Sequence, residues 1–100
     1  MGDAAVPIMS GDVTAQLDVK EAVRIAMEYF RELFGNPFMD LSLEEVQKAK
    51  DGQWAVTVGY VMARNTSAGL QPIPNYPRMY KLISVDSNTR EVASMKVAKF

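Results

Sequence analysis

An apolar stripe with helical spacing lies between residues 18 and 34. Apolar side chains recur there every three or four positions, at Val19, Ala22, Val23, Ala26, Met27, Phe30, Leu33 and Phe34. This spacing places them on one face of a helix. Asp18 stands at the N-cap position with Glu21 three residues later, and Gly35 fits the left-handed position after the last turn. The pattern predicts an amphipathic helix over 18–34 that needs a partner surface for its apolar side.

A second pattern, with a period of two, covers residues 54–63 and predicts a strand. One face would hold Trp54, Val56, Val58, Tyr60 and Met62, and the other Ala55, Thr57, Gly59, Val61 and Ala63. Since small residues let a helix approach closely, the helix is predicted to pack on the small face. The bulky face is then expected to be covered by other segments or partly exposed. Packing of the helix on the bulky face is the alternative that the pattern leaves open.

Residues 41–50 fit two structures. Ser42 and Glu45 have the spacing that caps a short helix. A strand that enters a hairpin at Asp51-Gly52 is the competing interpretation. We favour the strand, because the strong strand that follows needs a partner.

The rest of the chain predicts a long connection and two more strands. Pro72, Pro74 and Pro77 interrupt regular hydrogen bonding in residues 64–77, so we expect a long irregular loop there. Alternating residues predict strands over 78–86 and 91–99, joined by a turn at 86–90.

The elements together predict the domain organisation and the fold class. Residues 1–17 contain scattered glycine, proline and polar residues and are expected to form a flexible N-terminal arm. Residues 18–100 are expected to form a single α+β domain. In this domain one N-terminal amphipathic helix packs on a four-stranded antiparallel sheet, in the order α-β-β-β-β.

Composition removes several classes of chemistry. The chain has no cysteine and no histidine, so thiol nucleophiles, disulfides, zinc–thiolate sites and histidine general bases are excluded. Its formal net charge of −1 argues against nucleic acid as a partner. The sequence shows no apolar run of membrane-spanning length and no signal peptide, so we expect a cytoplasmic protein without a membrane partner.

The acidic residues do not form an evident acid–base or metal site. Glu44 and Glu45 are adjacent, and neighbouring side chains on a regular strand point to opposite faces. Asp86, Asn88 and Glu91 lack the spacing of an EF-hand loop and fit a turn better. We therefore assign no catalytic residue, no metal site and no cofactor.

The tail of the chain resembles a known family. Residues 80–92 have a tyrosine-bearing strand that runs into a hairpin in which Val85, Asp86, Thr89 and Val92 match the "VDxxTGxV" pattern of PepSY-type domains. Arg90 stands where that family usually has glycine. The order of helix and strands is also similar to the cystatin-like fold and to gas-vesicle accessory proteins of the O type. The latter have a "DGW"-like start to a strand, and Asp51-Gly52-Gln53-Trp54 is one residue longer than that pattern. The PepSY resemblance implies a non-catalytic binding or regulatory module.

The function expected from the sequence is a non-catalytic protein-binding or regulatory module, whose partner is another protein or a second copy of the chain as a homodimer. Apolar residues of the proline-rich connection and of the bulky sheet face are the expected contact residues. They are Leu70, Ile73, Tyr76, Trp54 and Tyr60. Folding of the connection back over the bulky face is the alternative for its three residues.

Two other functions stay open. One is a small-ligand pocket or weak enzyme between helix and sheet, at the face of Trp54, Tyr60 and Met62. The other is binding of single-stranded nucleic acid by basic residues with tyrosines nearby. Those basic residues are Arg78, Lys81, Arg90, Lys96 and Lys99.

Overall fold

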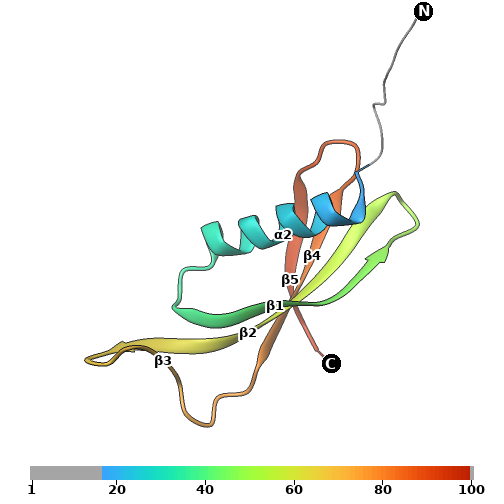
Figure 1. The fold of residues 1–100 in the computed structure, drawn as a ribbon. Helices are drawn as coiled ribbons and strands as arrows, with labels where there is room; N and C mark the ends of the chain where they lie inside the picture. The colour runs from blue at the N-terminus through green and yellow to red at the C-terminus, as the bar shows by residue number, and fades with distance from the viewer. Residues whose placement is uncertain (1–16, 100) are drawn as a thin grey trace, which may run out of the picture.

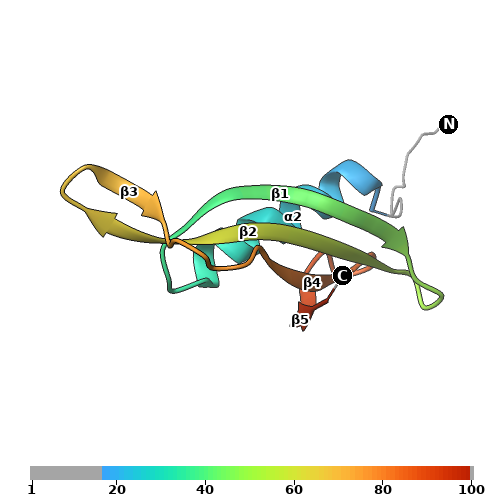
Figure 2. The same cartoon turned by 90° about the horizontal axis from the view of Figure 1, so that it is seen from below.

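The computed structural model describes residues 17–99 and shows one helix packed on an antiparallel sheet. The elements are α2 (Val19–Leu33), β1 (Phe38–Lys48), β2 (Gln53–Thr66), β3 (Gly69–Pro72), β4 (Met79–Asp86) and β5 (Val92–Ala98). The main strand order is β1-β2-β4-β5, and β3 pairs with the end of β2 (Figures 1 and 2). The predicted α+β class is confirmed, with β3 as one strand more than expected.

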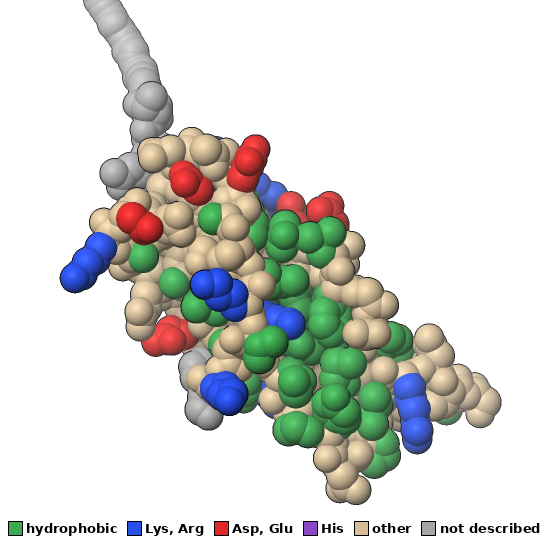
Figure 3. Space-filling model, turned by 180° about the vertical axis from the view of Figure 1, so that it is seen from behind, with side chains coloured by type: hydrophobic (Ala, Val, Ile, Leu, Met, Phe, Trp, Pro, Cys, Tyr) green, Lys and Arg blue, Asp and Glu red, His purple; other side chains and the backbone are tan. Residues whose placement is uncertain are grey.

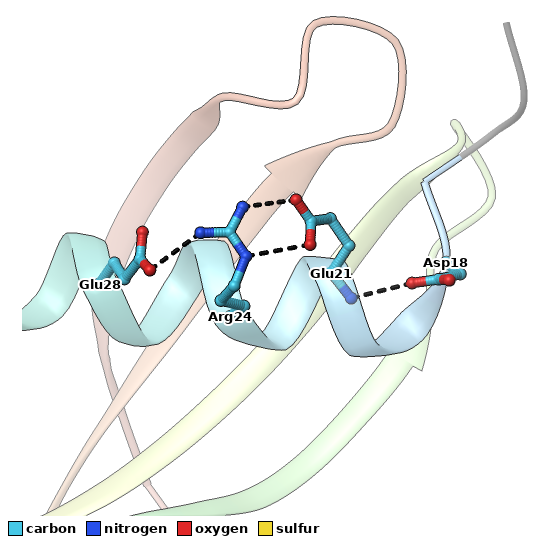
Figure 4. A network of polar contacts seen from close by, with 4 residues as sticks. All are labelled: Asp18, Glu21, Arg24 and Glu28. Carbon is cyan, nitrogen blue, oxygen red and sulfur yellow. Dashed lines mark hydrogen bonds and ion pairs between the residues drawn. The ribbon is translucent and has the colours of Figure 1, made fainter. Parts of the chain in front are cut away.

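Helix α2 begins at the predicted cap. The Asp18 carboxylate accepts a hydrogen bond of 2.9 Å from the backbone N–H of Glu21. The Glu21 side chain pairs with Arg24, which also donates to Glu28 at 2.8 Å (Figure 4). The hydrogen bond from Arg24 lowers the pKa of the Glu21 carboxyl. These pairs lie on the solvent-facing side of the helix, and its apolar side packs on the sheet.

The helix ends differently from the prediction. Phe34 is the C-cap residue, with an extended backbone (φ −75°, ψ 113°), and its N–H still donates to the carbonyl of Phe30 at 2.9 Å. Gly35 has no positive φ, so the left-handed glycine cap expected there was wrong. The extended Phe34 instead keeps its ring against Phe30, with the two ring centroids 4.7 Å apart.

The helix covers the bulky face of β2, the alternative that the sequence pattern left open beside packing on the small face. Val56 and Val58 are fully buried on this face together with Ile83 and Val85 of β4. The physical reason lies in the helix, whose own contact residues Ala22 and Ala26 are small and fully buried. Small residues on the helix and large ones on the sheet fill the interface as well as the reverse arrangement would.

Aromatic rings fill the end of the core near the helix C-terminus. Phe30 is fully buried, and its ring centroid lies 4.8 Å from that of Tyr60 and 5.0 Å from that of Phe38. Phe34 joins the same cluster, with its centroid 4.9 Å from that of Tyr60. Such tilted and edge-on contacts add to the free energy of burial.

The core begins one residue before the predicted domain boundary. Leu17 is 2% exposed, and its carbonyl accepts a hydrogen bond of 2.8 Å from the indole N–H of Trp54. The residue therefore belongs to the folded domain and not to the arm predicted over 1–17. The rest of that predicted arm lies outside the described residues.

Residues 41–50 contain a strand, as favoured. Strand β1 pairs with β2, and the hairpin between them places Gly52 at φ +83°, a backbone region that favours glycine. The pairing is irregular between Met39 and Ser42 and again between Leu43 and Glu45. These bulges change which side chains of β1 share a face.

The predicted long loop over 64–77 was wrong for its first part. Strand β2 continues to Thr66, turns at residues 67–68 and returns as β3. The Thr66 hydroxyl accepts from the N–H of Ala68 and donates to the carbonyl of Gly69, which has φ +103°. No proline lies between residues 64 and 71, and Pro72 stands at the last position of β3, where a missing N–H matters least. The irregular connection is therefore confined to residues 73–78.

Candidate functional site: the outer face of the sheet

The outer face is the sheet surface turned away from α2. The strand registers place one row of side chains across it, with Glu45 on β1 opposite Thr57, Thr57 opposite Leu82, and Leu82 opposite Lys96 on β5. We call these four residues the charged row. An acid stands at one edge of the sheet, a base at the other, and an uncharged pair between them.

An apolar band runs along this face. Figure 3 shows hydrophobic side chains gathered continuously on the side opposite the helix, with basic side chains beside them. Register places in this band Ala55, Val61, Ala63, Tyr80 and Leu82 from the main sheet, and Leu70 and Pro72 from β3. Leu70 is 39% exposed. The band therefore extends from the body onto the β2–β3 hairpin.

The middle of the outer face is hollowed. A shallow groove of about 380 Å³ crosses the sheet between Glu45 on β1 and Ala98 and Lys99 at the end of β5. Its floor includes Thr57 and Leu82. Because the groove crosses the strands and has apolar and small residues at its base, it suits a packed partner surface.

A polar clamp closes one part of this face. The guanidinium of Arg78 donates to the Glu44 carboxylate at 3.1 Å and to the backbone carbonyl of Asp40 at 2.9 Å. It also bonds the Ser42 hydroxyl. The clamp lies over Gly59, where an added Cβ would come 2.3 Å from the Glu44 carboxylate. Glycine is needed here so that two charged side chains can cross β2.

The bulges of β1 correct the prediction about the two adjacent glutamates. Glu44 lies over Gly59, and Glu45 is paired with Thr57, so both reach the outer face. The irregular register between Leu43 and Glu45 accounts for this, because an extra residue breaks the alternation of side chains. They act separately, since Glu44 binds Arg78 whereas Glu45 accepts from the side chain of Gln47 at 2.8 Å.

Two of the predicted contact residues lie on the helix side of the sheet, Tyr60 in the core and Trp54 packed against it. Tyr60 is 2% exposed within the aromatic cluster, and Trp54 is half-buried beneath the helix with Lys48 over its ring. The expected role of both in partner binding is corrected by this placement, because the helix covers the face that carries them. The residues of the outer face were not predicted as contact residues. The period-two pattern contained them, but helix packing had been assigned to that face.

The other three predicted contact residues lie near the hairpin. Tyr76 is 47% exposed, while Ile73 is half-buried and its N–H donates to the carbonyl of Met62 at 3.0 Å. Burial raises the pKa of the Tyr60 hydroxyl, and the nearby Tyr76 raises it further. The connection thus folds back toward Tyr60 while leaving much of Tyr76 at the surface.

The basic residues considered for nucleic acid are divided among different places. Arg78, held by Glu44, lies on the outer face together with Lys96 and Lys99, whereas Lys81 stands on the register row of the buried Val58, on the helix side of the sheet. Arg90 is in the β4–β5 turn. No single described surface brings the five together as the sequence suggested.

The turn that could have held a metal is explained by backbone hydrogen bonds. The Asp86 carboxylate accepts from the N–H groups of Asn88 and Thr89 at 2.7 and 3.1 Å. Among residues 17–99, no group of three or more acidic side chains is arranged to hold a metal ion.

A second groove lies at the edge of the helix and not over the Trp54 and Tyr60 face. It has a volume of about 460 Å³ and lies between α2, at Glu28 and Tyr29, and the start of β5, at Glu91 and Val92. The space predicted between helix and bulky face is instead occupied by the core.

No protein-family model, curated protein or solved structure matches this chain. In the part of the chain that the structure describes, no helix has the length and apolar character to cross a membrane. The fold defines a small α+β domain with a helix on one side of an antiparallel sheet.

Proposed function

We propose that this domain is a non-catalytic protein-binding module that uses the outer face of its sheet. The observation that supports it best is the apolar band, which continues from the sheet onto the projecting β2–β3 hairpin (Figure 3). Continuous apolar surface of this kind is typical of protein interaction sites.

The arrangement of the band fits a docking surface better than a reaction centre. Its central residues are aliphatic, small or aromatic, while the ionisable groups stand at the edges or are paired, as in the Arg78–Glu44 clamp. Protein interfaces have this distribution, with an uncharged centre and a polar rim. The exposed Leu70 supplies a side chain of this band that a partner can bury.

A capture experiment with matched variants tests the proposal. We expect the variant Leu70→Ser to lose partners that the native protein retains from an extract of its host. The control is Leu33→Ser, because Leu33 is also exposed, at 57%, but lies on the helix. Both variants should melt near the native temperature. Equal capture by all three proteins would contradict the proposal.

A further inference from the structure

The charged row has opposite charges at its two ends, which makes it complementary to a copy of itself. Glu45 and Lys96 are both exposed, on the outer strands β1 and β5. Neither Lys96 nor Lys99 forms an ion pair with a residue in the range 17–99. Three strand spacings of about 4.8 Å separate the two ends of the row.

A two-fold axis parallel to the strands would form two such pairs of opposite charges. Such an axis, placed between two sheets packed face to face, lays β1 of each copy over β5 of the other. Glu45 then stands opposite Lys96 at both edges of the interface. An axis perpendicular to the strands would place Glu45 over Glu45, so the charges select the first arrangement.

The two middle residues of the charged row are also complementary in size when the two copies are related by this axis. Thr57 on β2 would face Leu82 on β4 of the other copy, and Leu82 would face Thr57. Thr57 is 5% exposed at the floor of the groove, whereas Leu82 is half-buried. Large residues opposite small ones let two packed sheets interdigitate at their usual separation of about 10 Å.

We infer that the partner of the outer face is a second copy of this chain, packed sheet to sheet as a two-fold dimer with reciprocal Glu45–Lys96 pairs. This inference rests on the proposed function and names its partner. Closed two-fold dimers use the same patch on both copies, as this surface allows.

The test measures the dimer dissociation constant of the full chain by sedimentation equilibrium, at low and high salt. Glu45→Lys and Lys96→Glu should each weaken the native dimer by about tenfold, because each places like charges opposite one another. The double reversal Glu45→Lys/Lys96→Glu should return the constant close to the native value. Salt should reduce the difference between single and double variants.

A second pair of variants tests the middle of the interface. Leu82→Asp should abolish the dimer, since it buries a charge against the other copy. Val97→Asp is the control, because Val97 is 65% exposed on the register row of Val58, on the helix side of the sheet. This control should dimerise like the native chain.

Three outcomes would overturn the inference: a strictly monomeric native chain, a double reversal as weak as the single ones, or a chain that dimerises only after removal of residues 1–16. The last would show that those residues themselves cover the outer face. If the chain does not dimerise but still captures another protein, and this capture depends on Leu70, the inference fails while the proposed function holds.

Discussion

Arg78 and Glu44 form an ion pair of 3.1 Å across a strand that separates them in the sheet. Their side chains are 30% and 27% exposed, so the pair is partly shielded from water. It ties the beginning of β4 to β1 over the backbone of β2, and the space it occupies exists only because residue 59 is glycine.

Replacement of Gly59 by alanine should therefore destabilise the protein, by an amount that depends on whether Glu44 is present. The new Cβ would lie 2.3 Å from the Glu44 carboxylate and 2.9 Å from the Arg78 Nε, so the ion pair must move. We expect Gly59→Ala to lower the free energy of unfolding by about 1 kcal/mol. In a Glu44→Ala background the same substitution should be neutral or stabilising, because alanine is the better strand residue. Urea unfolding of the four proteins measures this coupling, and additive effects would refute it.

Phe30 is expected to be the most costly helix residue to truncate. It is fully buried and touches Phe34, Phe38 and Tyr60. Phe30→Ala should cost about 3–5 kcal/mol by leaving a cavity in the aromatic cluster. Leu33→Ala, on the same helix but exposed, should change stability by less than about 0.5 kcal/mol. Unfolding in denaturant measures the free energy of unfolding of both variants. A Phe30→Ala protein that no longer unfolds cooperatively would also agree with the prediction.

Tyr60 should make the domain sensitive to alkali. Burial raises the pKa of its hydroxyl above the ordinary value of 10.0, so the folded state keeps a proton that the unfolded state loses. The contribution of the protonated Tyr60 hydroxyl to the free energy of unfolding is complete below pH 10 and declines as the pH rises toward the pKa of the folded state. Unfolding free energies measured from neutral to alkaline pH should fall less steeply for Tyr60→Phe than for the native protein. An identical slope in both would show that Tyr60 does not cause the loss.

Arg90 should be improved by glycine. Its backbone has φ +62°, in a turn where its N–H donates to the carbonyl of Asp86 at 2.9 Å. Because a side chain is strained in the left-handed region, Arg90→Gly should raise stability by about 1 kcal/mol. Arg90→Ala keeps the strain and serves as the control, so an equal gain from alanine would exclude this explanation.

Local patterns were enough to predict most of the elements. The stripe that ends at Phe34 predicted α2, and Asp18 predicted its first residue, because capping and helical periodicity depend only on nearby residues. The Asp51-Gly52 turn identified the β1–β2 hairpin for the same reason. The hairpin at 67–68 was not predicted, because the three downstream prolines indicate an irregular segment, whereas only Pro72 lies in a strand.

The candidate site was less predictable than the elements. Trp54 and Tyr60 were expected at the surface because two faces of one strand cannot be ranked without knowing the size of the helix residues that meet them. Glu44 and Glu45 were expected on opposite faces because a bulge leaves no clear local signal. The charged row depends on pairings between residues as distant as Glu45 and Lys96, which a one-dimensional pattern does not contain.

The sequence by itself determined where the helix and the main strands lie, that the helix has one apolar side, and that histidine and cysteine chemistry is excluded. The tertiary structure alone decided that α2 covers the bulky face, that Gly59 lies beneath an ion pair, and that an acid and a base end the same row. The physical reason is range: capping, turns and periodicity act over a few residues, whereas packing and strand register join residues far apart in the chain.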